Sequence, residues 1–423
     1  MIETKFKNTE IGRIPEDWEV NTIGEISDVK TGPFGSALHS DDYVLNGVPI
    51  ITVEHIGHID IDISNGVPKV GKSDYHRLNS YVLKKNDLVF SRVGSVDRCS
   101  YVSENEDGWL FSGRLLRVRL KRDIDSIYLT YHLQTDDARK RVVSVAVGLA
   151  MPSINTKILS GVSVVFPKDK SEQTRIATAL SNIDALISEL GRLIEKKRAI
   201  KQGAMQQLLT GKKRLKGFSE PWVKLKIREL GELTGAGVDK LSKPNESKVR
   251  LLNYLDVYHR DYIYNTELQM EVTANDDKLA KCNVLQGDVF FTPSSEMAYD
   301  IALSAVAMET MPHVCYSYHI YRLRFNIDID LKYKAYMFKS QYFYNQANLT
   351  CEGSGKRYVI SLAKFRELSV SIPSSTSEQS AIATVLSSMD DEISALEQKK
   401  AKYEQIKQGM MQQLLTGKIR LVD

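Results

Sequence analysis

Two long stretches of the chain place apolar residues along one face of a helix. From 172 to 209 the apolar positions alternate between spacings of four and three residues. The spacing returns from 378 onward, where Lys400 interrupts it. If fully helical, the first stretch of 38 residues would be about 57 Å long. A one-sided stripe of this length needs a partner, and each stretch is the nearest partner for the other. The stripe residues are Ile176, Leu180, Ile183, Ile187, Leu190 and Ile194, then Ile382, Leu386, Met389, Ile393, Leu396 and Tyr403.

The regions that precede each stretch have a different pattern, with short apolar or alternating runs broken by Gly, Pro and Asn. Such runs predict strands of two α+β domains rich in β-structure. Helical patches are expected at 128–143 and 331–347. The predicted strands lie at 48–56, 87–93, 115–120 and 161–167, then at 249–258, 287–292, 319–325 and 368–373.

The two helical stretches are copies of one another. Residues 172–215 align without a gap on 378–421, at a constant offset of 206, with 26 of 44 positions identical. Only faint similarities recur before the helices, such as Val164–Pro167 against Val370–Pro373. The repeat therefore predicts that the fold occurs twice, with sequence kept only in the helix. Ser171 and Ser377 are candidate N-caps, and Gly211 and Gly417 stand where a helix would end.

Polar residues of the kind usually found at the surface are also identical between the two copies. A hydrophobic seam alone does not require this identity. One interpretation is that apolar heptad positions simply tolerate few changes. The favoured interpretation is that each copy makes the same contact with another protein. The residues expected to dock such a partner are Gln206, Gln207 and Lys212, and their equivalents Gln412, Gln413 and Lys418.

The duplicated helix, with its EQxxIAxxL start and KQGxMQQLLTGKxRL finish, resembles the specificity subunits of type I restriction-modification systems. The segments TGPFGSALHSDDY (31–43), DLVFSRVGSV (87–96) and GFSEPW (217–222) are similar to the recognition domains of that family. The resemblance covers the whole chain. It implies target recognition domains at 1–170 and 216–376, and spacer helices at 171–215 and 377–423. The helices would be antiparallel, forming a coiled coil with pseudo-two-fold symmetry.

The resemblance also implies function and partners. The chain would bind double-stranded DNA at an asymmetric bipartite site. It would direct two copies of a methylation subunit, and restriction subunits would join through the complex. We expect no bound cofactor and no association with a membrane. An adenine methyltransferase needs an Asn/Asp-Pro-Pro-aromatic loop for the flipped base, and no two prolines are adjacent here. We therefore expect a non-catalytic subunit.

Composition places limits on these expectations. No run of about 18 apolar residues occurs, and the N-terminus has no apolar signal-type region. Four cysteines are scattered without metal-site spacing, which favours reduced thiols in a cytoplasmic protein. The net charge is only +4, so DNA binding must depend on local clusters rather than on bulk attraction.

Two other motifs are compatible with different chemistry. Gly66–Ser73 fits the phosphate-loop formula GxxxxGK[ST], but an alternating segment precedes it and Pro68 removes one backbone donor. His55 and His58 could ligate a metal, but no third ligand has suitable spacing, so ordinary histidines are expected. A nucleotide-binding protein therefore remains a minor alternative. A coiled-coil assembly protein without a DNA role is a second alternative.

The expected DNA contacts lie in loops and on one strand. A Gly-rich loop allows close backbone approach, and arginine can bind guanine with two hydrogen bonds. For the arginines on the strand at 115–120, a solvated face is the competing interpretation. The candidates are Gly32, Phe34, Ser36, Arg92, Ser95, Arg98, Arg117, Arg119, Thr292, Ser294, Ser354, Lys356 and Arg357.

Overall fold

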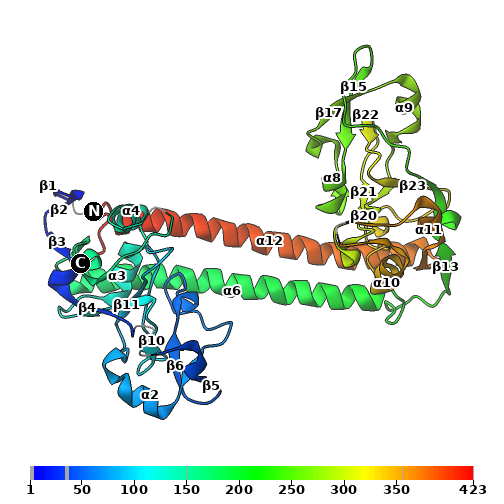
Figure 1. Cartoon of the computed structure of the whole chain (residues 1–423). Helices are drawn as coiled ribbons and strands as arrows, with labels where there is room; N and C mark the ends of the chain where they lie inside the picture. Colours follow the sequence, from blue (N-terminus) through cyan, green and yellow to red (C-terminus); the bar gives the residue numbers. More distant parts are fainter. Residues whose placement is uncertain (1–3, 34–37, 149, 356, 423) are drawn as a thin grey trace. The chain divides into compact units, whose positions relative to one another are not determined.

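A computed structural model describes residues 4–33, 38–148, 150–355 and 357–422. The chain divides into two compact units. The first unit contains residues 1–190 together with 399–423, and the second contains residues 191–398. Each unit therefore has one strand-rich head and one part of each long helix (Figure 1).

The two predicted long helices are present. Helix α6 runs over Lys170–Leu208 and helix α12 over Thr376–Leu414, each with 39 residues. The expected N-caps were placed slightly too late. The Asp169 carboxylate accepts a hydrogen bond from the Ser171 N–H at 2.9 Å, so Asp169 caps α6, and Ser377 lies inside the first turn of α12. Both helices end as expected, because Gly211 and Gly417 follow them with a φ of +69°.

Within each unit the two helix segments run antiparallel. In the first unit Arg420 pairs with Glu172, while Lys407, earlier in the chain, pairs with the later Asp184. In the second unit the contacts also run in opposite directions along the two helices, from Arg214–Glu378 to Lys201–Asp390 and Lys197–Glu392. The predicted stripe faces inward: its residues are buried or half-buried, and the interrupting Lys400 is half-buried.

In the part of the first head that the structure describes, there are three sheets and an N-terminal hairpin, with short helices between them. One sheet has the strand order β4-β11-β8-β9, a second has β10-β6-β7-β5, and β12 pairs with β3. The bounds are β1 Phe6–Thr9, β2 Gly12–Pro15, β3 Trp18–Thr22, α1 Ile23–Ile26, β4 Ser27–Thr31, β5 Tyr43–Val44, β6 Val48–Ile51, β7 Lys69–Val70, α2 Lys72–Arg77, β8 Leu88–Ser91, β9 Cys99–Tyr101, β10 Leu110–Phe111, β11 Leu115–Leu120, α3 Ser126–Leu133, α4 Asp136–Ser144, α5 Thr156–Ser160 and β12 Ser163–Pro167.

The head of the second unit repeats this plan. Its sheets have the orders β14-β23-β19-β21-β16 and β17-β15-β22-β18, β13 pairs with β26, and β20-β25-β24 forms a further small sheet. The bounds are β13 Trp222–Lys226, α7 Ile227–Leu230, β14 Gly231–Thr234, β15 Ser247–Leu252, α8 Tyr254–Tyr258, β16 Tyr262–Ile263, β17 Glu271–Ala274, α9 Asp276–Lys281, β18 Asn283–Val284, β19 Val289–Phe291, β20 Ser294–Ser295, β21 Ser304–Ala307, β22 Met311–Tyr316, β23 Tyr321–Phe325, α10 Gln341–Thr350, β24 Glu352–Ser354, β25 Arg357–Val359, α11 Leu362–Glu367 and β26 Ser369–Pro373.

The strand predictions hold with two corrections. The segment expected as one strand at 249–258 is a strand only to Leu252, because Asn253 caps helix α8. The segment 48–56 is likewise a strand only to Ile51. The helical patch at 128–143 divides into α3 and α4, where Thr135 caps the second helix. The patch at 331–347 contains a short 3₁₀ turn, Tyr333–Ala335, followed by α10.

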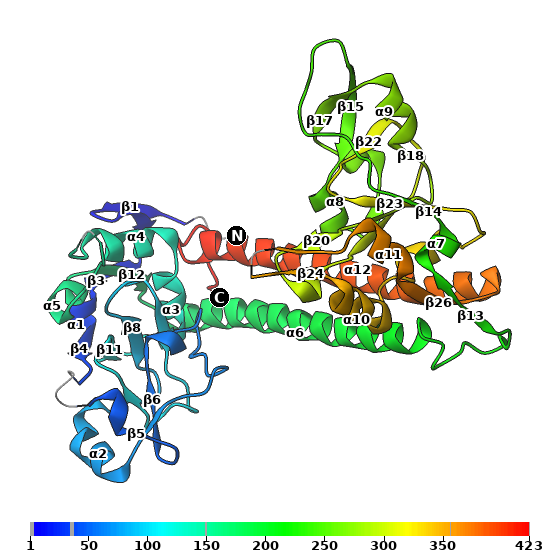
Figure 2. The same cartoon turned by 45° about the vertical axis from the view of Figure 1, so that its right-hand side comes forward.

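Each head has an inner core against the long helices and an outer core farther away. In the first unit, Ile176 and Leu180 of α6 and Leu414 and Leu415 join a cluster around Trp18. In the second unit the equivalent α12 residues, Ile382 and Leu386, join a cluster around Phe291 and Phe365. The outer core of the second head lies between the β15 sheet and β19. In both views β15, β17 and α9 are farther from α12 than β13 is (Figures 1 and 2).

Candidate nucleic-acid interface and partner-docking face

A buried ion pair joins head to helices in the first unit. Arg420 donates two hydrogen bonds to Glu172, at 2.6 and 2.7 Å, and two to Asp17, at 2.9 and 2.5 Å. The Glu172 side chain is fully buried, and the guanidinium lies over the ring of Trp18. The hydrogen bonds to Glu172 are the main reason that the pKa of Arg420 is raised, so the guanidinium stays charged.

The second unit repeats this junction at the offset of 206. Arg214 donates two hydrogen bonds of 2.6 Å to Glu378, which is also buried. Its guanidinium lies over Trp222 and donates to the Glu220 carbonyl at 2.8 Å. Head and helices are therefore fixed in the same way twice.

A second repeated contact involves a tyrosine of each head. Tyr131 donates a hydrogen bond to Asp184 at 2.7 Å, and Lys407 pairs with the same carboxylate. In the second unit Tyr336 donates to Asp390 at 2.7 Å, and Lys201 pairs with that carboxylate. Burial raises the pKa of both tyrosines, so each hydroxyl keeps its proton and remains a donor. The two lysines occupy seam positions, where apolar residues would otherwise be expected.

The predicted arginines of strand β11 form ion pairs with aspartates of the same head. The Arg117 side chain is 5% exposed and pairs with Asp28 at 2.6 Å. Arg119 donates two hydrogen bonds to the buried Asp87, at 2.8 and 2.6 Å. Both arginines thus form ion pairs within the first head, but Arg117 is buried whereas Arg119 is half-buried, and their contact with DNA stays a prediction.

The second head holds two arginines in the same way. Arg322 is buried, and Arg324 donates two hydrogen bonds to Asp288, at 2.8 and 2.6 Å. The repeated Arg-x-Arg pattern and its paired Asp were visible in the sequence and would have indicated a structural role.

Other predicted residues of the first head lie around the end of β8. Ser95 is exposed, while Arg92 and Arg98 are half-buried. Arg92 donates to the Gly113 carbonyl at 3.2 Å and Arg98 donates to the Ile56 carbonyl. These contacts orient the two arginines near the surface.

The Gly-rich loop is described only in part. Gly32 is buried, and an added Cβ would meet the Ser112 carbonyl oxygen at 2.1 Å, so this glycine is required by close packing rather than by DNA. Phe34 and Ser36 lie outside the described residues. A cavity of about 990 Å³ borders this loop, and its lining includes His39 and the exposed Arg114, which the predicted set left out.

In the second head the predicted residues separate into buried and exposed ones. Thr292 is buried and its hydroxyl accepts a hydrogen bond from the Leu303 N–H at 3.1 Å, which argues against contact with DNA. Ser294 lies in β20, which pairs with β25. Ser354 and Arg357 are exposed on the hairpin formed by β24 and β25. Lys356 lies outside the described residues.

This hairpin borders a cavity of about 380 Å³ that gathers polar and basic side chains. Its lining includes Lys240, Tyr254, Ser294, His319 and Arg357. Burial, together with the charges of Lys240 and Arg357, lowers the pKa of His319, so its imidazole is neutral near pH 7. A neutral imidazole, a hydroxyl and an arginine fork can together read both donors and acceptors on base edges.

The corresponding loop of the first head occupies the same place but has different chemistry. The Gly94 N–H donates to the Pro152 carbonyl at 2.8 Å, and the Ile154 N–H donates to the Arg92 carbonyl at 3.0 Å. In the second head the Ile360 N–H donates to the Pro293 carbonyl at 2.9 Å. The two loops are therefore equivalent in position. Val147 and Met151 are 62% and 65% exposed, whereas Arg357 carries charge on the second hairpin.

Most of the predicted docking residues are at the surface. Gln207, Lys212, Gln412 and Lys418 are exposed, and Gln413 is half-buried. Gln206 is an exception, because its Oε1 accepts a hydrogen bond from the Gln341 N–H at 2.9 Å and so belongs to the second head.

Gly203 and Gly409 lie on the same turns of the long helices, at equivalent positions of the repeat. Both are exposed, and an added Cβ would meet nothing within 4 Å at either site. A helix interior normally disfavours glycine by about 1 kcal/mol relative to alanine. These glycines keep the helix surface flat beside the docking residues.

The two remaining motifs are structural. Within Gly66–Ser73, Lys69 and Val70 form strand β7, so the segment is not an open phosphate-binding loop. His55 is buried, with Nδ1 3.0 Å from the Thr52 N and Nε2 2.9 Å from the Gly66 carbonyl oxygen. Among the described residues, no cluster of metal-ligating side chains occurs and no helix has the length and apolarity needed to cross a membrane.

Comparison with known proteins agrees with this repeated architecture. The family model of the type I restriction modification DNA specificity domain matches the chain twice, at residues 15–201 and 219–408. The chain belongs to this family and carries two copies of its domain.

Curated relatives and solved structures match along nearly the whole chain. The putative type I restriction enzyme MjaX specificity subunit of Methanocaldococcus jannaschii is 28% identical, covering 99% of this chain and 97% of the relative. The MjaVIII specificity subunit of the same organism is 24% identical with the same coverage. The S subunit of the type I system from M. genitalium has a similar fold, with a TM-score of 0.55, 14% identity and coverage of 94% and 96%. A structure described as showing complex assembly and conformational transition of the type I R-M system has a TM-score of 0.58, 14% identity and coverage of 96% and 99%.

Proposed function

We propose that this chain is the DNA-sequence recognition subunit of a type I restriction-modification complex. The observation that carries the proposal is the presence of two family domains on repeated junctions, with unlike loops at the equivalent edge of each head. Unlike loops would read unlike base sequences, so the DNA site would have two different half-sites. The chain between the heads would define an unread gap, as half-site spacing follows protein spacing in other bipartite DNA-binding proteins.

The second head reads its half-site through the cavity beside the β24–β25 hairpin. Arg357 and Lys240 carry the positive charge there, and Ser294 and His319 supply neutral hydrogen-bonding groups. The first head uses Ser95, Arg92 and Arg98 with the newly identified Arg114. These assignments follow from exposure and from the clustering of side chains that can bind phosphate or base edges.

The long helices dock the methylation subunits. Lys212 on one copy and its equivalent Lys418 on the other are both exposed, while Gln207 is exposed and its equivalent Gln413 is half-buried. One methylation subunit on each unit would therefore make equivalent contacts. Restriction subunits would join through that complex, and catalysis would belong to these partners rather than to this chain.

A coiled-coil assembly protein without a DNA role is the competing function. Its paired helices would explain the seam but would leave without a use the polar cavity of the second head, where Lys240 and Arg357 lie with Glu296. Filter binding with the methylation subunit present separates the two functions. A DNA-recognition subunit should bind its site tightly, with affinity that falls steeply as salt increases. Equal binding to any DNA sequence at every salt concentration would contradict the proposal.

The decisive experiment exchanges one head. Cells that carry the chain and its methylation subunit are sequenced by a single-molecule method that detects methylated adenine. We expect one motif with two unlike halves. Replacement of residues 1–170 by the first domain of another family member should change one half only. A palindromic motif, or a change in both halves, would contradict the division of labour between the heads.

A further inference from the structure

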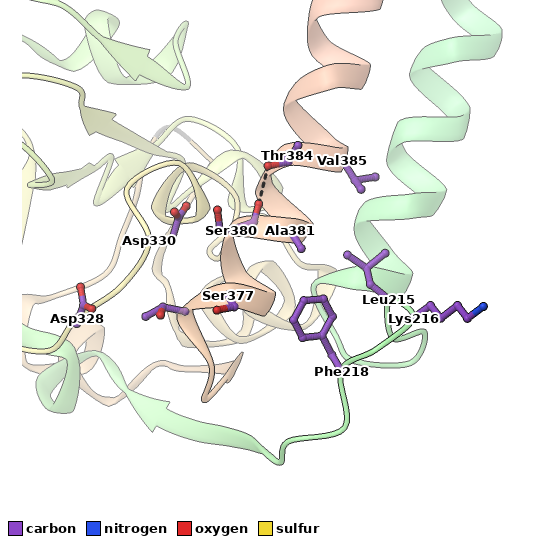
Figure 3. A pocket seen from close by; sticks show the side chains of 11 residues that line it. Leu215, Lys216, Phe218, Asp328, Asp330, Ser377, Ser380, Ala381, Thr384 and Val385 are labelled. Carbon is purple, nitrogen blue, oxygen red and sulfur yellow. Dashed lines mark hydrogen bonds between the residues drawn. The ribbon is translucent and has the colours of Figure 1, made fainter.

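A cavity of about 880 Å³ lies in the second unit, where the segment after α6 meets the first turns of α12. Leu215 and Phe218 come from that segment, while Ala381 and Val385 project from α12 (Figure 3). Asp328 and Asp330 line another part of the cavity, and the Lys216 side chain points away from them (Figure 3). The site therefore combines apolar walls with two carboxylates.

The internal repeat shows what occupies the equivalent place in the first unit. Ala381 corresponds to Arg175, and Leu215 corresponds to Leu421, both at the offset of 206. Arg175 Nη1 donates a hydrogen bond to the Leu421 carbonyl oxygen at 3.1 Å. An arginine of α6 thus spans the junction between helix and tail in the first unit, whereas Ala381 leaves that space open in the second.

A second cation is lost at the same junction. In the first unit Lys170 pairs with Asp123. The Asp125 N–H donates a hydrogen bond to Gln173 Oε1, and the Asp330 N–H donates to Gln379 Oε1 in the same way. This equivalence of Asp125 and Asp330 places Asp328 at the position of Asp123. Thr376 stands at the position of Lys170 and lines the cavity. The second unit therefore keeps the aspartates but has replaced both neighbouring cations by neutral residues.

The cavity has the chemistry that an arginine side chain requires. Its apolar lining can cover the methylene stem, and an aromatic ring can stack on a guanidinium. Carboxylates supply charged acceptors for the guanidinium hydrogen bonds. Asp328 is exposed and Asp330 is half-buried, so both are within reach of an incoming group. The same carboxylates repel phosphate, which argues against DNA as the occupant.

We propose that this cavity receives an arginine side chain of the methylation subunit that docks on the second unit. The partner arginine would do there what Arg175 does within the first unit. This inference rests on the proposed function, because that function supplies the partner. It adds that the two docking faces are unequal, with an additional anchoring point on the second unit only.

The first test uses the full chain without any partner. N-acetyl-arginine amide is titrated against protein labelled at Leu and Val methyl groups, and the Leu215 and Val385 signals are followed by NMR. We expect saturable shifts with half-saturation at about 1–10 mM, as befits one side chain. Neutral N-acetyl-citrulline amide should give none. Equal shifts with both amides, or no shift with either, would overturn the proposal whether or not the chain binds a methylation subunit.

The second test fills the cavity from within. Ala381→Arg recreates the residue of the first unit and should abolish the NMR shifts. The same substitution should weaken the complex with the methylation subunit at least about 10-fold, since removal of a buried anchor commonly has this effect. Ala395→Arg, at an exposed position of α12 that does not line the cavity, adds the same charge and is the matched control.

The outcomes are distinguishable. If Ala381→Arg binds the methylation subunit as tightly as the wild type does, the anchoring role is wrong even though the proposed function stands. If Ala395→Arg weakens the complex equally, added charge and not the cavity is responsible, which also overturns the inference. Retained hydrogen-exchange protection in both variants confirms that each is folded. If the NMR shifts occur but no complex forms with the wild type, the proposed partner is wrong.

Discussion

The junctions between heads and helices are near copies, whereas the edges of the heads are not. Arg420 on Glu172 and Arg214 on Glu378 make the same bidentate pair beside a tryptophan. The equivalent edge loops differ in chemistry. One head exposes the apolar residues Val147 and Met151 there, whereas the other exposes Arg357. Buried polar contacts tolerate little change because each donor needs its acceptor, while an exposed loop can change its chemistry freely. One framework therefore carries two recognition edges of different chemistry.

Loss of the junction arginine should have the largest effect. Arg420→Ala leaves the fully buried Glu172 carboxylate without its partner, and we expect the first unit to lose about 3 kcal/mol of stability. Hydrogen exchange resolved by unit should show faster exchange in the first unit and little change in the second. Arg214→Ala should show the reverse pattern. Arg198→Ala, which removes an exposed pair with Glu397, is the control and should change little. Uniform loosening of both units would contradict this comparison.

A buried histidine should distinguish the units by pH. His132 accepts a hydrogen bond from the Val165 N–H at 3.3 Å, and burial lowers its pKa to about 3. The unfolded chain takes up a proton near pH 6.5, which the folded first unit resists. The stability that neutral His132 contributes is therefore present above pH 6.5 and is lost as pH falls toward 3. Between pH 7.5 and 5 the loss should be about 2 kcal/mol.

The second unit offers the natural comparison, because Met337 is buried at the position equivalent to His132. Urea unfolding of the first unit, followed at both pH values, measures the effect. His132→Gln keeps an acceptor for the Val165 N–H without a titrating group and should flatten the pH dependence. If the free energy of unfolding of His132→Gln depends on pH as steeply as that of the wild type, groups other than His132 cause the pH dependence.

Removal of the arginine from the second edge loop should affect one half-site. Arg357→Ala is expected to weaken DNA binding about 10-fold, because an arginine contact with a base contributes about 1–3 kcal/mol. Competition with DNA changed in either half-site measures the effect, and discrimination should relax in one half only. Arg228→Ala, at an exposed arginine of α7 outside the cavity, is the control. Equal relaxation in both halves would contradict the assignment.

The smallest expected effect concerns the two helix glycines. Gly203→Ala and Gly409→Ala should each stabilise the isolated chain, by about 0.5–1 kcal/mol, because alanine favours the helix and open space surrounds both sites. If a partner packs closely on these turns, the same substitutions should weaken assembly with the methylation subunit. Thermal unfolding and a binding titration on the same samples separate the two effects. Improved stability with unchanged assembly would remove these turns from the docking face.

The helices and the duplication were predictable from sequence, because a seam of four and three residues over 38 positions leaves few alternatives. Most strands were predictable for the same reason, except where Asn253 capped a short helix inside an apolar run. The DNA-facing set was predicted less well. Arg117 looked available because its partner, Asp28, lies 89 residues away in the chain. Lys240 and His319 were missed because only the folded sheets bring them beside Arg357.

The first unit combines two segments that are far apart in the sequence, residues 1–190 and 399–423, and this sets an order of events during synthesis. Residue 420 emerges from the ribosome 248 residues after Glu172, the carboxylate that it neutralises. The second unit, residues 191–398, is complete before that moment. During synthesis the first unit therefore stays incomplete until the second unit has been made. Premature termination a few codons before Arg420 would leave a product with a complete second unit. Its first unit would lack the ion pair between Arg420 and Glu172.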